Sequence, residues 1–307
     1  MATVRELTGK IKLDGSARDA EPMKGHTSFR IGGPADLYVA PRSPQDVTRI
    51  SAWCVERSIP CFFLGGGTNI LVADRGVRGA VVDLSGLSGI QAREVPGGVI
   101  VSALCGTPVS DVAEFARDRG LRGMEFAYSL PGSVGGAVWM NARCYDREMS
   151  DVLEYVEYLD PRGVVRRDPI DRAEWSYKRS PFQAGGKIIL GAAVRLEPGS
   201  RSDIDALMRE HKADRERKGH FLFPCAGSVF KNNHDFGAPT GKLVDSLGLK
   251  GRRIGGAQIA PFHGNIIINT GDASAGDVLS LMQMMEAEVR ARLGFALERE
   301  VVLVGDW

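Results

Sequence analysis

The chain has 307 residues, of which 43% are hydrophobic and 25% charged, and this composition is typical of a globular protein long enough for two domains. Lys and Arg total 39 against 38 for Asp and Glu, so the net charge of +1 gives no electrostatic reason to expect nucleic acid or an anionic membrane as a partner. The 5 cysteines are widely spaced without a C-x-x-C pair, and no apolar run has the length of a signal peptide or membrane span, so we expect a cytoplasmic protein without disulfides or metal.

The first half of the chain predicts a mixture of short strands and helices. Ser43 is expected to cap a helix that has Pro44 in its first turn and Asp46 as the partner in a capping box. The apolar run 59–64 predicts a buried strand that leads into three glycines, and two further strands and a helix ending at Gly120 follow. Because strands and helices do not alternate strictly, we predict the α+β class.

Two more helices are predicted toward the C-terminus. The first spans residues 202–218, is capped by Ser202 and Asp205, and ends in a charged segment that reads as a solvated connector. The second begins after Ser274 and ends at Gly294. The apolar faces are expected to be Ile204, Leu207, Met208 and His211 in the first helix, and Val278, Leu281, Met282, Met285, Val289 and Leu293 in the second.

The stretch FFLGGGTNILV, residues 62–72, joins two apolar runs through three glycines. Consecutive glycines let main-chain N–H groups converge on a phosphate, but the same sequence is compatible with a glycine-rich hairpin. No lysine follows as in a P-loop, and the residues after the glycines predict a strand rather than the helix of a dinucleotide-binding turn. Further glycine-rich turns at 30–35 and 131–137 suggest a long ligand that lies against the backbone at several points.

Two sets of motifs resemble a known family of flavoenzymes. TSFRIGGPADLYV, FLGGGTNILVADRGVRGAVVDLSGL and EFAYSLPGSVGGAVWMNA resemble the FAD-binding domain, of the vanillyl-alcohol-oxidase-like fold, in bacterial UDP-N-acetylenolpyruvoylglucosamine reductases. CAGSVFKNN, GKLVDSLGLKGRRIGGAQIAPFHGNIIIN and GFALEREVVLVG resemble the substrate domain of that family. The resemblance covers roughly residues 24–305. It implies an FAD-binding domain of two α+β subdomains in residues 1–200 and a smaller α+β substrate domain in residues 201–307.

The resemblance implies FAD as the bound cofactor and NADPH as the reductant. The FAD diphosphate is expected against the glycine-rich turn at 65–69. The residues implied to bind the cofactor are Arg30, Ile31, Gly32, Gly65, Gly66, Gly67, Thr68, Asn69, Ile70, Pro131, Gly132, Ser133, Gly135, Gly136 and Asn141.

The reaction implied by the resemblance needs an acid and an enolate-stabilising site. The family reduces the enolpyruvyl ether of UDP-N-acetylglucosamine to UDP-N-acetylmuramate in peptidoglycan precursor synthesis. Hydride addition at C3 leaves negative charge on C2, which must be stabilised and then protonated. Ser228 in AGSVFKN matches the family's proton donor, and Glu300 in LEREV matches its catalytic acid. Glu298 is a chemically equivalent alternative, but Glu300 directly precedes an apolar Val as in the family pattern.

The third catalytic position departs from the family. The family pattern is Tyr-Arg-x-Ser, whereas this chain has Tyr177-Lys178-Arg179-Ser180. Lysine keeps the positive charge but loses the planar fork of a guanidinium. Either Lys178 polarises the substrate carboxylate as a point charge, or a local shift brings Arg179 inward, or the site is impaired. We favour Lys178, because adjacent positions of a strand face opposite sides.

Other residues extend the implied site. Lys218, Lys231 and Asn232 are candidates for binding the UDP diphosphate and sugar. Arg143 and Cys144 add bulk where the family usually has small residues. The chain also resembles the family type that lacks a tyrosine-bearing loop over the substrate.

Two other classes of function stay open at this stage. A related FAD oxidase or electron-transfer protein would keep the glycine-rich turns, but it gives no reason for AGSVFKN and LEREV to occur together. A non-catalytic paralogue that binds a UDP-sugar or flavin is motivated by Lys178. The expected partners are the small molecules UDP-sugar and NADPH, without nucleic acid or membrane insertion, and the sequence does not decide the oligomeric state.

Overall fold

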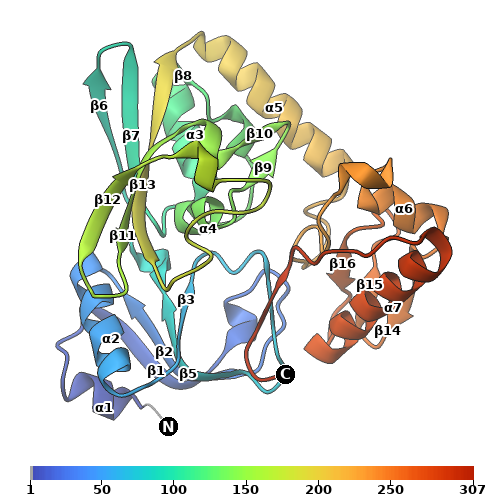
Figure 1. The fold of residues 1–307 in the computed structure, drawn as a ribbon, viewed down its shortest axis with the longest axis horizontal. Coiled ribbons are helices and arrows are strands. Elements are labelled where there is room, and N and C mark those ends of the chain that lie inside the picture. The colour runs from blue at the N-terminus through green and yellow to red at the C-terminus, as the bar shows by residue number, and fades with distance from the viewer. Residues whose placement is uncertain (1–2) are drawn as a thin grey trace. The chain divides into compact units, whose positions relative to one another are not determined.

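The computed structural model describes residues 3–307, which form two compact units interleaved along the sequence (Figure 1). The first unit takes the residues up to Asp19, then Leu37–Gly66 and Gly79–Asp214. The second takes Ala20–Asp36, Gly67–Arg78 and Arg215–Trp307. A single domain boundary near residue 200 stays a prediction, since the units are defined by contacts between segments rather than by one cut.

A six-stranded sheet dominates the first unit, in the order β12-β11-β13-β7-β6 with β8 paired to β13. Its strand pairs are antiparallel, and the long strand β13 pairs with β11 on one side and β7 on the other. The strands are β6 (Ile90–Val95), β7 (Gly98–Leu104), β8 (Leu121–Arg122), β11 (Leu153–Leu159), β12 (Val165–Pro169) and β13 (Ile188–Pro198).

A smaller four-stranded sheet has the order β1-β2-β5-β3, in which β3 and β5 are parallel. Helix α2 packs its apolar face on this sheet, because Val47 and Ile50 of α2 share one core with Val39 of β2 and Val82 of β5. The elements are β1 (Gly15–Pro22), β2 (Pro34–Pro41), α2 (Pro44–Glu56), β3 (Cys61–Leu64) and β5 (Val77–Asp83).

Helices α3 and α4 and most of α5 complete the first unit, together with the short helix α1 and the two-stranded pair β9 and β10. Apolar residues of α3 and α4 share the core of the large sheet. The bounds are α1 (Val4–Thr8), α3 (Val109–Asp118), α4 (Val134–Trp139), β9 (Arg143–Cys144), β10 (Arg147–Glu148) and α5 (Arg201–Arg217).

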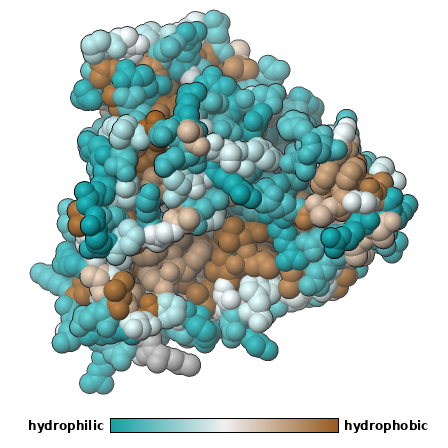
Figure 2. All heavy atoms as spheres, viewed as in Figure 1, coloured by the Kyte–Doolittle hydropathy of each residue, from teal (hydrophilic) through white to brown (hydrophobic). Residues whose placement is uncertain are grey.

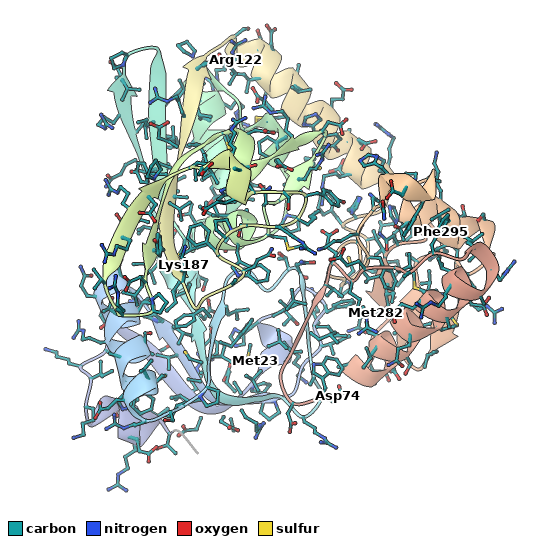
Figure 3. All side chains as sticks on the ribbon, viewed as in Figure 1. Met23, Asp74, Arg122, Lys187, Met282 and Phe295 are labelled. Carbon is teal, nitrogen blue, oxygen red and sulfur yellow. The ribbon has the colours of Figure 1, made fainter. Side chains whose placement is uncertain are left out.

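The second unit has a core of its own, formed around helix α7 and two small sheets. Strands β14, β15 and β16 form an antiparallel sheet, whereas β4 and β17 form a parallel pair. Asp74, labelled in Figure 3, accepts hydrogen bonds from the N–H groups of Ala275 and Gly276 at the start of α7. The bounds are β4 (Ile70–Val72), α6 (Thr240–Ser246), β14 (Arg253–Ile254), β15 (Ala257–Ile259), β16 (Ile267–Asn269), α7 (Ala275–Leu293) and β17 (Val302–Val304).

Short 3₁₀ turns join many of these elements, and the α+β prediction is confirmed. The face drawn in Figure 2 is largely hydrophilic, as expected for a chain with 25% charged residues. The 3₁₀ turns are η1 (Met23–Gly25), η2 (Leu84–Gly86), η3 (Glu125–Ala127), η4 (Met149–Asp151), η5 (Arg172–Glu174) and η6 (His234–Phe236).

Helix α7 begins and ends at the residues that the sequence predicted. Ser274 and Asp277 form the expected capping box, and Gly294 ends the helix with a φ of +77°. The predicted stripe of α7 from Val278 to Val289 is buried, and Met282 is labelled on it in Figure 3.

Two details of the other helices are corrected. Ser43 caps α2 as predicted, but the carboxylate of Asp46 accepts from the N–H of Asp14 at 3.2 Å instead of completing a capping box. The predicted cap of α5 at Ser202 is wrong, because α5 begins at Arg201 and the N–H of Asp203 donates to Ser200 Oγ. Leu207, expected on the inner face of α5, is also exposed.

Candidate functional site

The first unit brings two of the glycine-rich turns into contact. A Cβ added to Gly66 would lie 2.7 Å from Gly132 Cα, and one added to Gly65 would lie 2.6 Å from Ser133 Oγ. These distances are shorter than real Cβ contacts, so the two turns pack main chain against main chain and only glycine fits. The turns therefore present main-chain groups without covering side chains, which fits a cofactor that binds through its phosphates.

Helix α4 follows the second of these turns, and its first N–H groups already have protein partners. Ser133 is the N-cap, and its Oγ accepts from the N–H of Gly136 at 3.3 Å. The N–H groups of Val134 and Gly135 donate to the carbonyl oxygens of Thr107 and Cys105, which follow β7, both at 2.8 Å. The start of α4 is thus held by protein, and Pro131 lies in the loop before it.

The second unit contains the rest of the stretch FFLGGGTNILV. Gly67 has a φ of +62°, and a Cβ there would lie 2.1 Å from the carbonyl oxygen of His26. Gly32 has a φ of +141°, Thr68 lies in the loop before β4, and Ile70 is the first residue of β4. The hairpin interpretation is wrong, because β3 pairs with β5 and β4 with β17, in both cases parallel, and the two strands of a hairpin would pair with each other antiparallel.

Two predicted cofactor residues of the second unit use their polar groups inside the protein. Ile31 is 3% exposed, and its N–H and C=O both bond the hydroxyl of Thr27. Asn69 Nδ2 donates to the carbonyl oxygen of Glu300 at 3.1 Å. Arg30 is exposed, with a φ of +56°. The sequence did not reveal that Asn69 holds the main chain of Glu300.

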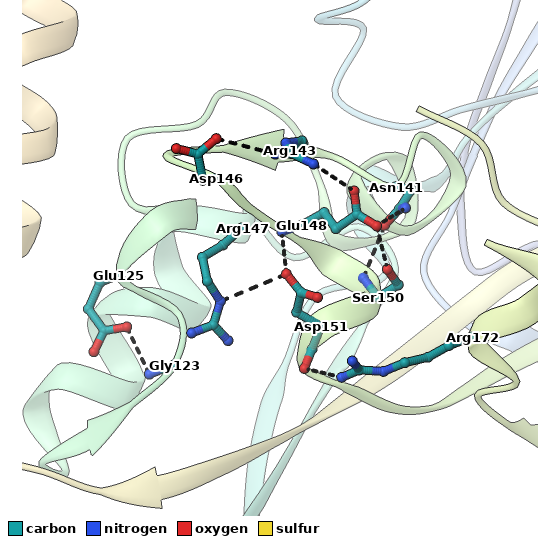
Figure 4. A network of polar contacts seen from close by, with 10 residues as sticks. All are labelled: Gly123, Glu125, Asn141, Arg143, Asp146, Arg147, Glu148, Ser150, Asp151 and Arg172. Atoms are coloured by element: carbon teal, nitrogen blue, oxygen red, sulfur yellow. Dashed lines mark hydrogen bonds and ion pairs between the residues drawn. The ribbon is translucent and has the colours of Figure 1, made fainter. Parts of the chain in front are cut away.

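Asn141 follows α4 and is fully buried, with a φ of +43°. Its Nδ2 donates to Glu148 Oε1 at 2.9 Å and to the carbonyl oxygen of Ser176 at 3.0 Å. Its Oδ1 accepts from the N–H of Ser150 at 3.0 Å, so every polar atom of the amide has a protein partner (Figure 4). The side chain therefore joins the segment around β10 to the turn at Ser176, and contact of Asn141 with FAD stays a prediction.

Lys178 lies at the tip of a four-residue turn rather than in a strand. Ser176 and Arg179 exchange two main-chain hydrogen bonds, of 3.2 and 2.9 Å, around Tyr177 and Lys178. We expected Lys178 and Arg179 to lie on opposite faces of a strand. This expectation is wrong, because the two residues belong to a turn in which Lys178 has a φ of +59°. Lys178 is half-buried and Arg179 is exposed, which still favours Lys178 for a role in a site.

Two cations lie near the ring of Tyr177. Lys178 Nζ and Arg143 Cζ are each 5.9 Å from the ring centroid, within the range of a cation–π contact. The guanidinium of Arg143 also contacts Asp146 at 3.2 Å and Glu148 at 3.8 Å (Figure 4). Arg143, a departure from the family pattern, therefore belongs to the surroundings of Lys178 within the first unit.

In the second unit, the segments that carry Ser228 and Glu300 lie side by side. The N–H of Glu300 donates to the carbonyl oxygen of Val229 at 2.8 Å, and the N–H of Lys231 donates to that of Glu298 at 2.8 Å. These bonds form a short antiparallel pair. Within residues 3–307, the hydroxyl of Ser228 makes no hydrogen bond to protein, so it is available to a ligand.

Glu298 and Glu300 have different surroundings. The exposed carboxylate of Glu298 accepts from Lys231 Nζ at 2.7 Å. Glu300 is half-buried. Between them, Arg299 makes two hydrogen bonds to Glu286 of α7, at 2.5 and 2.8 Å, and this pairing raises the pKa of Arg299. The partial burial of Glu300 and the exposure of Glu298 thus favour Glu300 as the residue that acts on a ligand.

The other substrate candidates are spread over the second unit. Asn232 Oδ1 accepts from the N–H of Thr240 at 3.0 Å, and Lys218 is exposed. His263, which the sequence analysis did not single out, is half-buried, and its Nδ1 accepts from the N–H of Asn265 at 3.2 Å. Burial and then the charge of Lys218 lower the pKa of His263. The sequence offered only its position in the motif APFHGN as a signal.

Membrane-spanning helices, metal ligands and cysteines were examined over the described residues, 3–307. No helix in that range is long and apolar enough to cross a lipid bilayer. The same range contains no cluster of His, Cys, Asp and Glu side chains that could hold a metal ion. All of the cysteines are free, and burial raises the pKa of Cys105 to about 12.

The chain is similar to known proteins along almost its whole length. Residues 35–168 match the FAD binding domain family, and residues 218–304 match the C-terminal domain of UDP-N-acetylenolpyruvoylglucosamine reductase. A reductase of that name from Treponema denticola is 41% identical, over 96% of this chain and 95% of its own. The one from Caldanaerobacter subterraneus is 40% identical over 93% of each chain. The crystal structure of the reductase from Thermus caldophilus matches with a TM-score of 0.78 at 30% identity, over 95% of this chain and 99% of its own.

Proposed function

The chain belongs to the UDP-N-acetylenolpyruvoylglucosamine reductase family, and we propose that it carries out that reaction through Ser228, Glu300 and Lys178. It is an FAD-dependent oxidoreductase of peptidoglycan precursor synthesis, with NADPH as the reductant. Its substrate is the enolpyruvyl ether of UDP-N-acetylglucosamine, and its product is UDP-N-acetylmuramate.

The reaction adds a hydride to C3 of the enol ether and a proton to C2. FAD, when bound, supplies the hydride transfer from NADPH to C3. The electron pair of the double bond then resides at C2 and is delocalised into the carboxylate. The protein must balance this negative charge and deliver one proton to C2.

Ser228 is proposed to donate the proton to C2. A hydroxyl is a weak acid, so its proton transfer needs a substrate held within hydrogen-bonding distance and an environment that stabilises the alkoxide. The support for this role is that the Ser228 hydroxyl has no competing bond within residues 3–307. Glu300 acts as the family's catalytic acid, and its main chain is fixed by Val229 and Asn69.

Lys178 is proposed to face the carboxylate of the substrate. An ammonium there stabilises the charge that develops at C2 and in the carboxylate. It does so as a point charge, because lysine lacks the fork of arginine. Lys218, Lys231 and Asn232 stay candidates for the UDP group. Lys231 would need to share its ammonium with Glu298, which it contacts at 2.7 Å.

The observation that carries the proposal is the pairing of the segments around Ser228 and Glu300. The motifs AGSVFKN and LEREV are separated by about 70 residues of sequence, and main-chain bonds bring them together in one unit. An FAD oxidase gives no reason for this arrangement. The two glycine-rich turns that pack against each other at Gly66 and Gly132 support the FAD assignment.

The test is anaerobic turnover of the purified holoprotein with NADPH and UDP-N-acetylglucosamine enolpyruvate. We expect NADPH oxidation that depends on this substrate and a product heavier by two hydrogens. A protein that carries FAD but leaves the substrate unreduced would be a binding paralogue. A protein that oxidises NADPH without this substrate in a parallel assay in air, passing the electrons to oxygen, would be an oxidase.

The cellular location is part of the proposal. The free cysteines support a reducing compartment, since disulfides form in oxidising ones. We therefore infer a cytoplasmic enzyme that acts on small molecules.

A further inference from the structure

Lys178 has a main-chain conformation that lysine rarely adopts. Its φ of +59° lies in the left-handed region, which costs a non-glycine residue about 1 kcal/mol or more. A residue persists in such a conformation only when its surroundings hold it there. The question is which groups hold the turn of Tyr177 and Lys178.

One side chain bonds the main chain of Lys178 directly. Gln183 Nε2 donates to the carbonyl oxygen of Lys178 at 3.0 Å and to that of Trp139 at 3.0 Å. A side-chain amide has two N–H donors, so both bonds form at the same time. Gln183 thus ties the strained turn to the last residue of α4.

The anchor at Trp139 is fixed by a second bond. Ser180 Oγ donates to the same carbonyl oxygen at 2.7 Å. The other side of the turn is held by buried Asn141, whose Nδ2 donates to the carbonyl oxygen of Ser176 and whose remaining bonds are drawn in Figure 4. Of these supports, only Gln183 reaches Lys178 itself and is exposed.

We propose that Gln183 is a positioning residue that holds Lys178 so that its ammonium meets the carboxylate of the substrate. Both hydrogen bonds of Gln183 go to main-chain carbonyls, so it acts through the backbone rather than on the substrate. The inference rests on the proposed role of Lys178. It adds that the turn depends on this amide.

The chemistry of lysine explains why positioning matters here. A guanidinium offers several donors in a fixed fork, whereas an ammonium is a single charge at the end of a flexible stem. The place of the charge then depends more strongly on where the main chain holds the Cα atom. Releasing the carbonyl of Lys178 would let the residue leave its strained φ and carry the ammonium away.

A double-mutant cycle with Gln183→Leu and Lys178→Met tests the inference. Leucine removes the two donors at similar volume, and methionine removes the charge and keeps the apolar stem. Three quantities are measured anaerobically for each variant: the bleaching rate of the flavin absorbance with NADPH, its recovery rate with the enolpyruvyl substrate, and the calorimetric Kd of that substrate for the oxidised protein. Gln91→Leu, at an exposed glutamine on β6 of the same unit, is the matched control.

We expect Gln183→Leu to slow the recovery and weaken substrate binding by about tenfold, which corresponds to about 1.4 kcal/mol. The bleaching rate should be unchanged, and Gln91→Leu should behave as the wild type. In the Lys178→Met background, Gln183→Leu should add less than about twofold, because its effect passes through the lysine.

The two ways to fail are distinct. If Lys178→Met leaves both the recovery rate and the Kd unchanged, the proposed role of Lys178 falls and the positioning role falls with it. If Lys178→Met slows the recovery but Gln183→Leu has no effect, or has the same effect with and without the lysine, only the positioning role is overturned.

Discussion

The two units hold their candidate catalytic residues in different ways. In the second unit, the N–H of Glu300 donates to Val229 and its carbonyl accepts from Asn69, and the neighbouring N–H of Lys231 donates to Glu298. In the first unit, two main-chain bonds between Ser176 and Arg179 close the turn that carries Lys178, and two side-chain amides bond its carbonyl oxygens. The main chain of Glu300, by contrast, is bonded by one side-chain amide, that of Asn69. The two arrangements differ in how far they depend on residue type.

From this difference we expect some substitutions to lower the rate of the reaction and others to lower the free energy of unfolding. Main-chain N–H and C=O groups are present whatever side chains a segment carries. A segment held by them tolerates replacement of its side chains, except the one that reacts. A turn that depends on side-chain amides, or a loop contact that only glycine fits, has no such substitute.

The largest expected effect is a loss of activity without a loss of stability in the second unit. Glu300→Gln should lower kcat by about 100-fold or more, because it removes the carboxyl group that acts as the acid. The unfolding midpoint in urea should stay the same, since the bonds to Val229 and Asn69 involve the main chain of Glu300.

The control for this prediction is Glu298→Gln. Glu298 is exposed and bonds Lys231 at 2.7 Å, so its substitution should change kcat by less than about threefold. An equal loss in both variants would contradict the assignment of Glu300, and a lowered midpoint in Glu300→Gln would contradict the comparison.

In the first unit, Asn141→Ala should lower the free energy of unfolding by about 3 kcal/mol. Asn141 is fully buried, and its removal leaves the N–H of Ser150 without its partner and takes one of two donors from the carbonyl oxygen of Ser176. Urea unfolding measures the loss. Asn233→Ala is the control, because Asn233 is exposed and should cost less than about 1 kcal/mol. Equal costs would mean that the buried amide does not hold the turn.

The glycine-rich turns should be sensitive to a single methyl group. Gly66→Ala would place a Cβ 2.7 Å from Gly132 Cα, and we expect a loss of about 2 kcal/mol in unfolding free energy from overpacking. Gly25→Ala, where a Cβ meets no atom within 4 Å, should be neutral within about 0.5 kcal/mol. A neutral Gly66→Ala would show that the two turns are not in close contact.

The smallest effect concerns the cap of α7, the helix that carries Glu286. Asp277→Ala should cost about 1 kcal/mol at pH 7. The N–H of Ser274, followed by other donors, lowers the pKa of Asp277, so the contribution is present above the usual carboxyl range near pH 4 and is lost as the pH falls through the lowered folded value.

Urea unfolding of wild type and Asp277→Ala between pH 7 and pH 3 measures this loss. The difference between the two should shrink below about pH 4. Asp272→Ala, at an exposed aspartate of the same segment, is the control and should change the free energy of unfolding by less than about 0.5 kcal/mol at pH 7. A constant difference at every pH would contradict the role of the charged cap.

The parts of the fold that could be predicted depend on neighbours in sequence. Helix α7 has its cap, its apolar stripe and its terminating glycine within one stretch, so Ser274, Asp277 and Gly294 were sufficient. The strand before the first glycine cluster was likewise clear from a short apolar run. The cap of α5 was placed wrongly, because Ser200 and Ser202 offer the same hydroxyl chemistry two residues apart.

The parts that could not be predicted depend on distant segments. The sequence alone could not exclude a hairpin at the glycines, because the strands pair with others instead of with each other: β4 pairs with β17 near the C-terminus, and β3 pairs with β5. The turn at Lys178 was interpreted as a strand, because no neighbouring residue in the sequence indicates that this lysine has a positive φ. The roles of Asn141 and Gln183 need tertiary contacts to be seen, although the motif resemblance identified the catalytic candidates themselves.

The measurement that tests the account most directly is the anaerobic absorbance of the flavin in the wild type and in Ser228→Ala. Each protein is mixed first with NADPH and then with UDP-N-acetylglucosamine enolpyruvate. We predict equal bleaching by NADPH in both, and a recovery with substrate that is at least about 100-fold slower in Ser228→Ala, since only the proton donor is lost. Recovery at the wild-type rate in Ser228→Ala would contradict the assignment of Ser228, and no recovery in the wild type would contradict the proposed reaction.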